Sequence, residues 1–161
     1  MKLLIPSAKE LNEQARIVEP QPLSEKTKTI LQAFKAFSLE ELATFYGISE
    51  ERAQVEKERI EALLAGNAKT YPALELFDGL MYRSIERKDL SEKEQTYLQE
   101  HLLITTALYG VLPAYEGIAP HRLDFMMKLK PAGKSLKVLW KEDYDQAVEG
   151  EEQLLSLLSS E

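Results

Sequence analysis

A lysine and an arginine beside two predicted strands are the side chains of this sequence best suited to bind an anion. Lys9 follows the strand predicted over residues 2–5, and Arg122 opens a stretch in which apolar and polar residues alternate. Groups at strand ends of an open α/β sheet converge in a crevice. There the two cations could hold a phosphate or carboxylate. In an enzyme Lys9, Arg122, Tyr82 and Tyr109 would be the catalytic candidates, with a tyrosine as proton donor.

The same residues also have a plain structural interpretation. Arg122 could pair with Asp124 on the solvent face of its strand, and the two tyrosines could pack in the core. Residue types alone do not decide between a crevice and this alternative, so both stay open.

A second candidate for anion binding is a pair of helices predicted over residues 38–65. Ser38 begins a capping box, in which its hydroxyl accepts a backbone N–H and the glutamate three residues later reaches back. Gly47 can adopt the positive φ that ends the first helix. Ser49 is typical of the N-cap of the next helix. The pattern predicts two helices joined by a tight corner.

Such a corner is found in helix-hairpin-helix and helix-turn-helix DNA-binding proteins, in which turn amides or the second helix approach the duplex. Gly47, Ser49 and Arg52 would then contact phosphates. The second helix is rich in glutamate, which repels phosphates, and a plain αα-hairpin is the alternative interpretation.

Several kinds of site lack the residues that they require. The chain has no cysteine, which excludes a disulfide framework, a thiolate metal site and cysteine catalysis within it. Its two histidines, His101 and His121, do not have the spacing of a metal-binding helix face, and we expect neither metal nor cofactor. Glycine-rich phosphate loops, nucleophile elbows and His-Glu-x-x-His motifs are missing, so serine hydrolases and nucleotide-binding proteins lose their usual sequence support. An enzyme is accordingly the less favoured class.

Length and charge limit the remaining possibilities. The 161 residues suit one domain, and 20 basic against 27 acidic side chains give a net charge of −7. This balance disfavours non-specific binding to nucleic acid or anionic lipid, although a local basic patch remains possible. An acidic surface would also suit an interaction scaffold. With neither a signal peptide nor an apolar run of about 18 residues, a cytoplasmic protein without membrane contact is expected.

Hydrophobic periodicity and turn residues predict the elements that position these groups. Strands are expected over 2–5, 122–130 and 153–158, the last of which could also be a helix. Helices are expected over 24–37, 38–46, 49–65, 72–85, 91–109 and around 134–144, and a loop over 110–121. The result is a mixed α/β single domain, in which helices surround a small sheet. An apolar element so near the last residue predicts that the C-terminal part of this domain is absent.

Several segments resemble the peroxide stress protein YaaA family. Residues 108–112 (Leu-Tyr-Gly-Val-Leu) and 118–124 are similar to the family signature Leu-Tyr-Gly-Val-Leu … Pro-Tyr-Arg-Leu-Glu. The opening residues 4–9 resemble its Ile-Ser-Pro-Ala-Lys start, with proline and serine exchanged. Residues 79–82 and 139–140 resemble its Gly-Asp-Val-Tyr and Phe-Trp segments. Order and spacing agree along most of the chain.

The resemblance implies a cytosolic bacterial protein that limits hydrogen peroxide damage, including iron-linked damage. It also implies DNA binding through a helix-hairpin-helix and a positively charged cleft, in a mixed α/β fold peculiar to the family. Lys9, Arg122 and Lys128 would then contact phosphates, with backbone amides from residues 38–65. The family continues into a basic C-terminal third beyond the length of this chain, and His121 replaces its usual tyrosine. The alternative stays an enzyme or small-anion-binding protein that uses the crevice.

Overall fold

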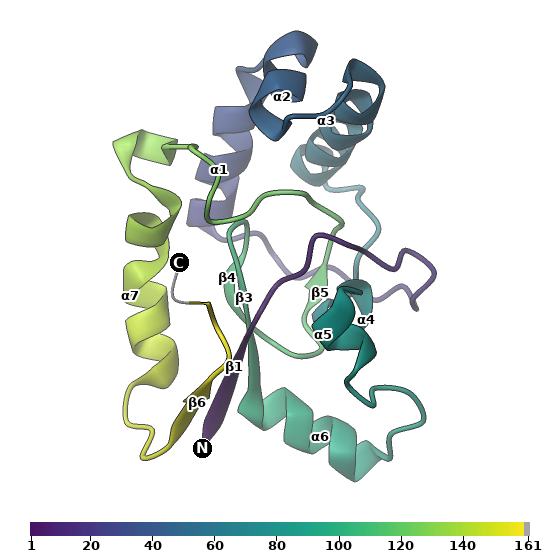
Figure 1. Cartoon of the computed structure of the whole chain (residues 1–161), viewed down its shortest axis with the longest axis vertical. Coiled ribbons are helices and arrows are strands. Elements are labelled where there is room, and N and C mark those ends of the chain that lie inside the picture. Colours follow the sequence, from purple (N-terminus) through teal and green to yellow (C-terminus); the bar gives the residue numbers. More distant parts are fainter. Residues whose placement is uncertain (160–161) are drawn as a thin grey trace.

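Four strands form the main sheet of the computed structural model, which describes residues 1–159 (Figure 1). Strand β1 pairs in parallel with β3 and β6, and β4 pairs antiparallel with β3, in the order β4-β3-β1-β6. The bounds are β1 (Lys2–Pro6), β3 (Leu102–Thr106), β4 (Gly110–Pro113) and β6 (Leu154–Ser156). A second, antiparallel sheet consists of β2 (Tyr71–Pro72) and β5 (Gly117–Ile118).

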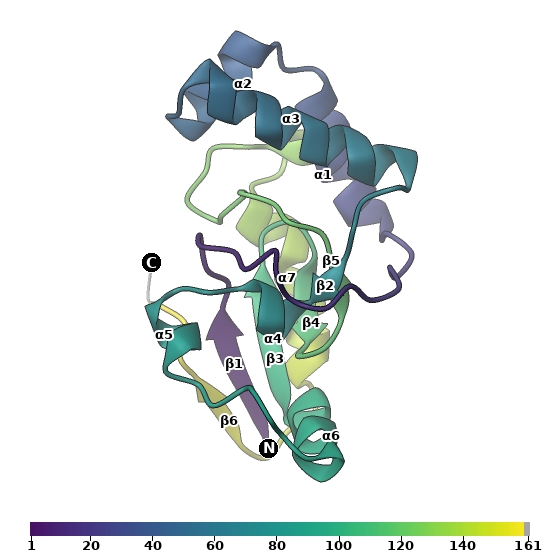
Figure 2. The same ribbon diagram turned by 90° about the vertical axis from the view of Figure 1, so that its right-hand side faces the viewer.

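Helices surround this sheet, which confirms the predicted mixed α/β fold. Figures 1 and 2 show α7 on one side of the strands, α4 and α5 on the other, and α1 to α3 above them. The bounds are α1 (Glu25–Lys35), α2 (Leu39–Tyr46), α3 (Glu50–Ala65), α4 (Ala73–Leu76), α5 (Leu80–Arg83), α6 (Glu92–His101) and α7 (Leu136–Val148), with a 3-10 turn at Pro131–Gly133. Within residues 1–159, none of these helices has the length and apolar character needed to cross a bilayer.

Serine N-caps determine where the five longer helices begin. In each, the serine hydroxyl accepts a hydrogen bond from the backbone N–H three residues later, which satisfies one of the free donors of the first turn. Ser38 and Ser91 form complete capping boxes with Glu41 and Glu94, as their sequences predict.

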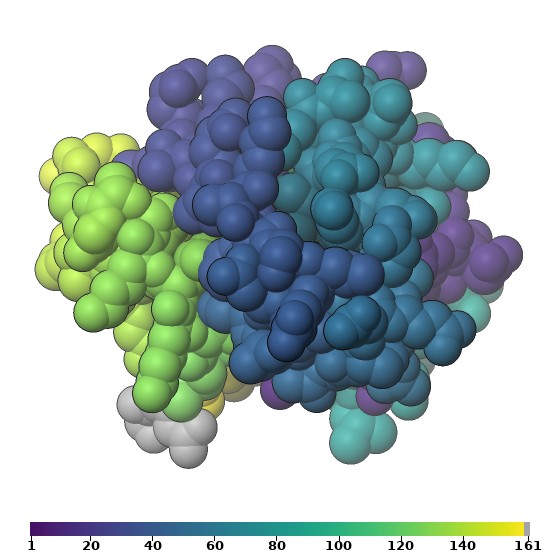
Figure 3. Space-filling view, turned by 90° about the horizontal axis from the view of Figure 1, so that it is seen from above, coloured from purple at the N-terminus to yellow at the C-terminus, as the bar shows by residue number. Residues whose placement is uncertain are grey.

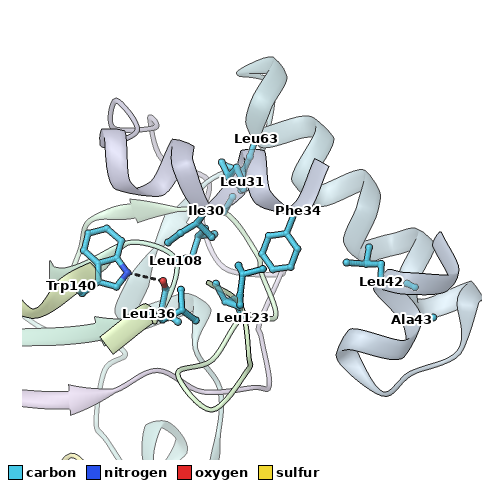
Figure 4. Close-up of a cluster of buried hydrophobic side chains, with 14 residues drawn as sticks. Ile30, Leu31, Phe34, Leu42, Ala43, Leu63, Leu108, Leu123, Leu136 and Trp140 are labelled. Carbon is cyan, nitrogen blue, oxygen red and sulfur yellow. Dashed lines mark hydrogen bonds between the residues drawn. The ribbon is translucent and has the colours of Figure 1, made fainter. Parts of the chain in front are cut away.

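The two faces of the sheet pack into different parts of the core. Ile5 lies opposite Ile104, and both belong to a cluster with Phe77 beneath α4 and α5. A second cluster lies between α1, α2, α3 and α7, with Phe34, Leu123 and Trp140 among its members (Figure 4). The indole of Trp140 donates a hydrogen bond of 2.8 Å to the carbonyl of Ala107, in the turn after β3.

Gly110 makes close packing against this indole possible. A Cβ atom at Gly110 would lie 2.5 Å from Cε3 of Trp140, and the residue has a φ of +78°. Both features require glycine, because side chains rarely adopt this backbone conformation and no room exists for one. The Leu-Tyr-Gly segment of the family signature therefore matches a contact between the main sheet and α7.

The predicted helix over residues 91–109 is wrong in its second half. Helix α6 ends at His101, and residues 102–106 form the buried strand β3. The apolar spacing suits a helix, but Leu-Leu-Ile-Thr-Thr is a short, largely β-branched run, and pairing with β1 and β4 buries all five residues.

The predicted strand over residues 122–130 is also wrong. Apolar and polar residues of this segment still differ in burial, since Leu123 and Leu129 are buried while Lys128 and Lys130 are exposed. The backbone, however, turns within the segment, because Oδ1 of Asp124 accepts a 2.8 Å hydrogen bond from the N–H of Met126. This local bond is typical of an Asx turn, which competes with strand pairing.

Two further element predictions need correction. The predicted helix over residues 72–85 is divided into β2, α4 and α5, with an interruption at Phe77, which bridges to Leu11. The predicted loop over residues 110–121 contains β4 and β5. In contrast, the expected strand near the C-terminus is present as β6, and its Leu154 and Leu155 side chains are about half exposed.

Candidate functional site

A cavity of about 580 Å³ opens at the carboxyl ends of β1 and β3. Its walls come from the end of β1 and the residues that follow it (6–9), Thr105 of β3, residues 121–126, and one face of α7. Because β1 and β3 are parallel, their ends meet at the same edge of the sheet, and the N–H of Ser7 donates a 3.0 Å bond to the carbonyl of Thr105. The cavity therefore lies at the end of the predicted first strand, but the second strand beside it is β3 and not the predicted strand over residues 122–130.

The cavity brings Lys9 and Arg122 together, which the sequence predicted, and adds two lysines of α7. Four cations and two carboxylates line it: Lys9, Arg122, Lys137, Lys141, Asp124 and Asp145. Nζ of Lys9 lies 3.8 Å from Asp124, and Nζ of Lys141 lies 2.5 Å from Asp145. In residues 1–159, Arg122 and Lys137 have no salt-bridge partner. The cavity is thus a locally cationic part of an acidic chain.

Asp124 pairs with Lys9 rather than Arg122. Its Oδ2 is the atom near Lys9, and its Oδ1 accepts the N–H of Met126. The alternative in which Arg122 and Asp124 pair across a strand does not occur among the described residues. Arg122 is half-buried, with a side chain available to the cavity.

Tyr82 and Tyr109 are not among the described residues that line the cavity. The Tyr82 hydroxyl donates a 2.6 Å bond to the carbonyl of Pro6, and burial raises the pKa of Tyr82. The Tyr109 hydroxyl accepts a 3.0 Å bond from the N–H of Ala119, and burial raises the pKa of Tyr109 to about 12. Both phenols brace the backbone around the site, and a direct role for either stays a prediction.

Tyr144 of α7 is the phenol that the cavity contains. It lines the cavity together with Thr105 at the end of β3, and burial raises the pKa of its hydroxyl. The sequence carried a signal for it that the prediction did not use. Lys137, Lys141 and Tyr144 have a spacing of four and three residues, which places them on one helix face.

His121 forms part of the cavity wall as a neutral ring. Its Nδ1 lies 2.9 Å from the carbonyl oxygen of Ala119, and its ring meets those of Tyr109 and Phe77 edge to face. Burial lowers the pKa of His121 to about 4, so the imidazole carries no charge at pH 7. No group of three or more potential metal ligands exists among residues 1–159.

The corner between α2 and α3 lies outside the cavity lining. Gly47 has a φ of +63°, and its N–H and that of Ile48 donate to carbonyl groups of α2 at 3.2 and 3.0 Å. The Ser49 hydroxyl accepts the N–H of Arg52 at 3.3 Å. These three polar groups are engaged within the helix pair. Contact of Gly47, Ser49, Arg52 and the exposed Lys128 with DNA stays a prediction.

Arg122 connects the cavity to this helix pair. It also lines a gap of about 10 Å³ beside Tyr46 of α2 and Glu56 of α3. Burial raises the pKa of Glu56, while the charges of Arg59 and Arg122 oppose that rise. Figure 3 shows α2 and α3, in blue, next to the green segment that follows residue 120.

Comparison with known proteins places the chain in a family. The family model described as peroxide stress protein YaaA matches residues 1–161. Similar curated proteins, each named UPF0246 protein, come from Streptococcus gordonii, Streptococcus sanguinis and Streptococcus pneumoniae, with 59%, 55% and 53% identity. Each match covers the whole of this chain and 66% of the relative, so the chain spans just under two thirds of their length. The chain belongs to the peroxide stress protein YaaA family.

Proposed function

We propose that this chain binds phosphate groups of DNA at the cavity, as part of a cytoplasmic protein that limits peroxide damage. The observation that carries the proposal is the pair of cations, Arg122 and Lys137, that line a cavity without a carboxylate partner among residues 1–159. Family membership supports the link to peroxide stress.

The cavity cations have different roles in this proposal. Arg122 is half-buried and lines both the cavity and the gap beside α3, and its planar guanidinium could donate two parallel hydrogen bonds to a phosphate. Lys9 is exposed, with 78% of its side chain accessible, and supplies a mobile charge at the rim. Lys128, also exposed, would extend the contact along the DNA backbone.

Salt-dependent fluorescence anisotropy tests this proposal. Labelled duplex and junction DNA are titrated with the 161-residue chain and with the full-length Streptococcus gordonii relative. Binding by the chain should weaken steeply as salt rises, because phosphate contacts release counterions. Arg122→Gln should weaken binding, whereas Lys93→Gln, an equal charge change on an exposed residue of α6, should not. If the folded chain fails to bind at low salt, the proposal is wrong for this cavity, and binding by the relative alone would assign the DNA contacts to another part of that protein.

A second candidate function is the binding or conversion of a small anionic molecule. Its support is the volume of the cavity, since about 580 Å³ lies within the roughly 300–1,000 Å³ typical of small-molecule pockets. Lys9 and Arg122 would hold the anion, and Tyr144 is the phenol placed to donate a proton. The double variant Lys9→Ala/Arg122→Ala should then abolish thermal shifts caused by phosphate-bearing compounds. Unchanged shifts would contradict this function.

A further inference from the structure

We infer that the cavity binds one nucleotide whose base is not paired. Its phosphate would contact the cations, and its base would pack against an apolar wall. This inference rests on the proposed anion-binding function and names the chemical class of the ligand. The nucleotide has two possible sources, a free mononucleotide or an unpaired nucleotide within DNA.

The lining of the cavity combines two kinds of surface. Beside the cations lie apolar side chains that a bare phosphate would not use, among them Phe77, Leu123, Phe125 and Met126. A ligand with an anionic end and a planar apolar body contacts both surfaces. Aromatic side chains stack on nucleobases, a contact worth as much as several hydrogen bonds in single-stranded nucleic acid complexes.

Phe125 is the side chain best placed for such stacking. Its ring and that of Tyr144 both line the cavity and meet edge to face, with centroids 6.3 Å apart at 74°. Phe125 is only half-buried, although it is apolar. Met126 beside it is 66% exposed, and its flexible thioether can adapt to a flat ring. Apolar surface therefore remains uncovered in the same cavity as Arg122.

The volume of the site suits a single nucleotide. A cavity of about 580 Å³ can accept one nucleotide but not a stacked duplex. A base inside a duplex must leave the stack before it can enter a pocket of this kind. Hydroxyl groups of Ser7 and Tyr144 at the walls can meet the polar edge of a base that does enter.

Binding of dAMP, deoxyribose 5-phosphate and inorganic phosphate to the 161-residue chain, measured by calorimetry, tests the role of the base. The nucleotide should bind about tenfold or more tightly than the sugar phosphate, because stacking adds to the phosphate contacts. A second arm compares duplexes with one unpaired adenine and with an abasic sugar at that position. Preference for dAMP alone identifies a free nucleotide, and preference for the unpaired adenine identifies DNA. If both arms are indifferent to the base, the inference is wrong.

Phe125→Leu separates the base from the phosphate. This variant keeps apolar volume but removes the ring, so affinity for dAMP should fall about tenfold while that for deoxyribose 5-phosphate stays unchanged. Tyr97→Leu, which removes an exposed ring of α6, is the matched control. Thermal melting verifies that both variants fold, and Phe125→Tyr, which keeps a ring, should restore the affinity. If Phe125→Leu binds dAMP like the wild type, the base does not stack there and the inference fails. If the inference fails but the wild type still binds DNA and Arg122→Gln weakens that binding, the proposed function stands. If the wild type binds neither DNA nor any of the phosphate compounds, the inference and the proposed function are both wrong.

Discussion

The cavity and the α2–α3 helix pair both offer cations to an anion, but they differ in how those cations are used. In the cavity, four cations face two carboxylates, and Arg122 and Lys137 form no salt bridge among the described residues. The segment 38–65 contains seven glutamates and three cations. Of these cations, Arg59 contacts Glu56 and Glu13 at 2.8 and 2.9 Å. The helix pair therefore shares the negative charge of the whole chain, whereas the cavity is locally positive.

The two regions also differ in whether their polar groups already have partners. At the corner of the helix pair, the N–H groups of Gly47 and Ile48 and the hydroxyl of Ser49 are bonded within the pair. In the cavity, Arg122 and Lys137 have no such partner in the described chain. Because groups that are already paired gain little from a ligand, the comparison identifies the cavity as the better binding site.

The largest expected effect compares a glycine packed against α7, the helix that forms one wall of the cavity, with a glycine of the helix pair. Gly110→Ala should lower the free energy of unfolding by about 3–5 kcal/mol, because its positive φ and the indole of Trp140 both oppose a Cβ atom. Gly47→Ala should cost only about 1 kcal/mol, since φ is positive there but no atom lies within 4 Å. Urea denaturation measures both values. Equal losses would contradict the tight contact between β4 and α7.

The two regions should respond to acid in opposite directions. The folded-state pKa of His121 is about 4, below the unfolded value of about 6.5, so only the unfolded chain binds this proton between those values. Stability should therefore fall by about 3 kcal/mol from this group as pH decreases from 6.5 to 4. The pKa of Glu56 is raised, so on acidification the folded chain binds that proton first and gains stability.

Variants isolate these opposite contributions. Urea midpoints of His121→Gln should depend less on pH than those of the wild type between pH 7 and 4, and midpoints of Glu56→Gln should depend on it more. The slope with pH is the readout, so a uniform loss of stability in either variant does not affect the test. Parallel slopes in all three proteins would show that neither group titrates as its burial requires.

Arg122 and Arg52 should differ in their effect on DNA binding. Arg122→Gln is expected to weaken binding by about tenfold to a hundredfold, the usual value of a charge-assisted hydrogen bond to phosphate. Arg52→Gln should change the dissociation constant less than about threefold, because exposed charges at a distance are screened. Anisotropy at fixed low salt compares them, with Lys93→Gln as the control for net charge. If Arg52→Gln weakens binding more than Arg122→Gln does, the helix pair and not the cavity contacts the phosphates.

The smallest expected effects come from the serine caps. Ser38→Ala and Ser135→Ala should each cost about 1 kcal/mol of stability, because each leaves a helix donor without its partner. Only Ser135→Ala should also weaken dAMP binding, by about twofold to threefold, since α7 carries Lys137 and Tyr144 into the cavity. Calorimetry and urea denaturation on the same samples compare the two. An equal loss of dAMP affinity in Ser38→Ala would make the helix pair part of the site.

Local chemistry was predictable from the sequence, whereas pairing between distant segments was not. Serine, glutamate and glycine signals located the helices at Ser38 and Ser91 correctly, because caps depend on residues within one turn. Strand β3 was missed because Leu102 and Thr105 fit a helical stripe, and only its partners β1 and β4 make it a strand. Tertiary pairing decided that segment against its periodicity.

The candidate site was predicted in part for a related reason. Lys9 and Arg122 reach the same cavity although residues 122–130 are not a strand. The burial of Leu123 still fixes the start of this segment against the core, and its neighbour Arg122 stays partly exposed in the cavity wall. Tyr144 was missed since Thr105, which lines the cavity with it, lies in the segment predicted as helix. A correct assignment of β3 would have placed the end of that strand opposite the lysine face of α7.

Trp140 gives the molecule a spectroscopic reporter of its own. It is the single tryptophan of the chain, it is 2% exposed, and its indole is bonded to the turn after β3. Its fluorescence should be blue-shifted in the folded chain and should move to the red when α7 separates from the sheet. Because α7 forms one wall of the cavity, the emission wavelength distinguishes ligands that enter a preformed site from ligands that displace this wall, without any attached label.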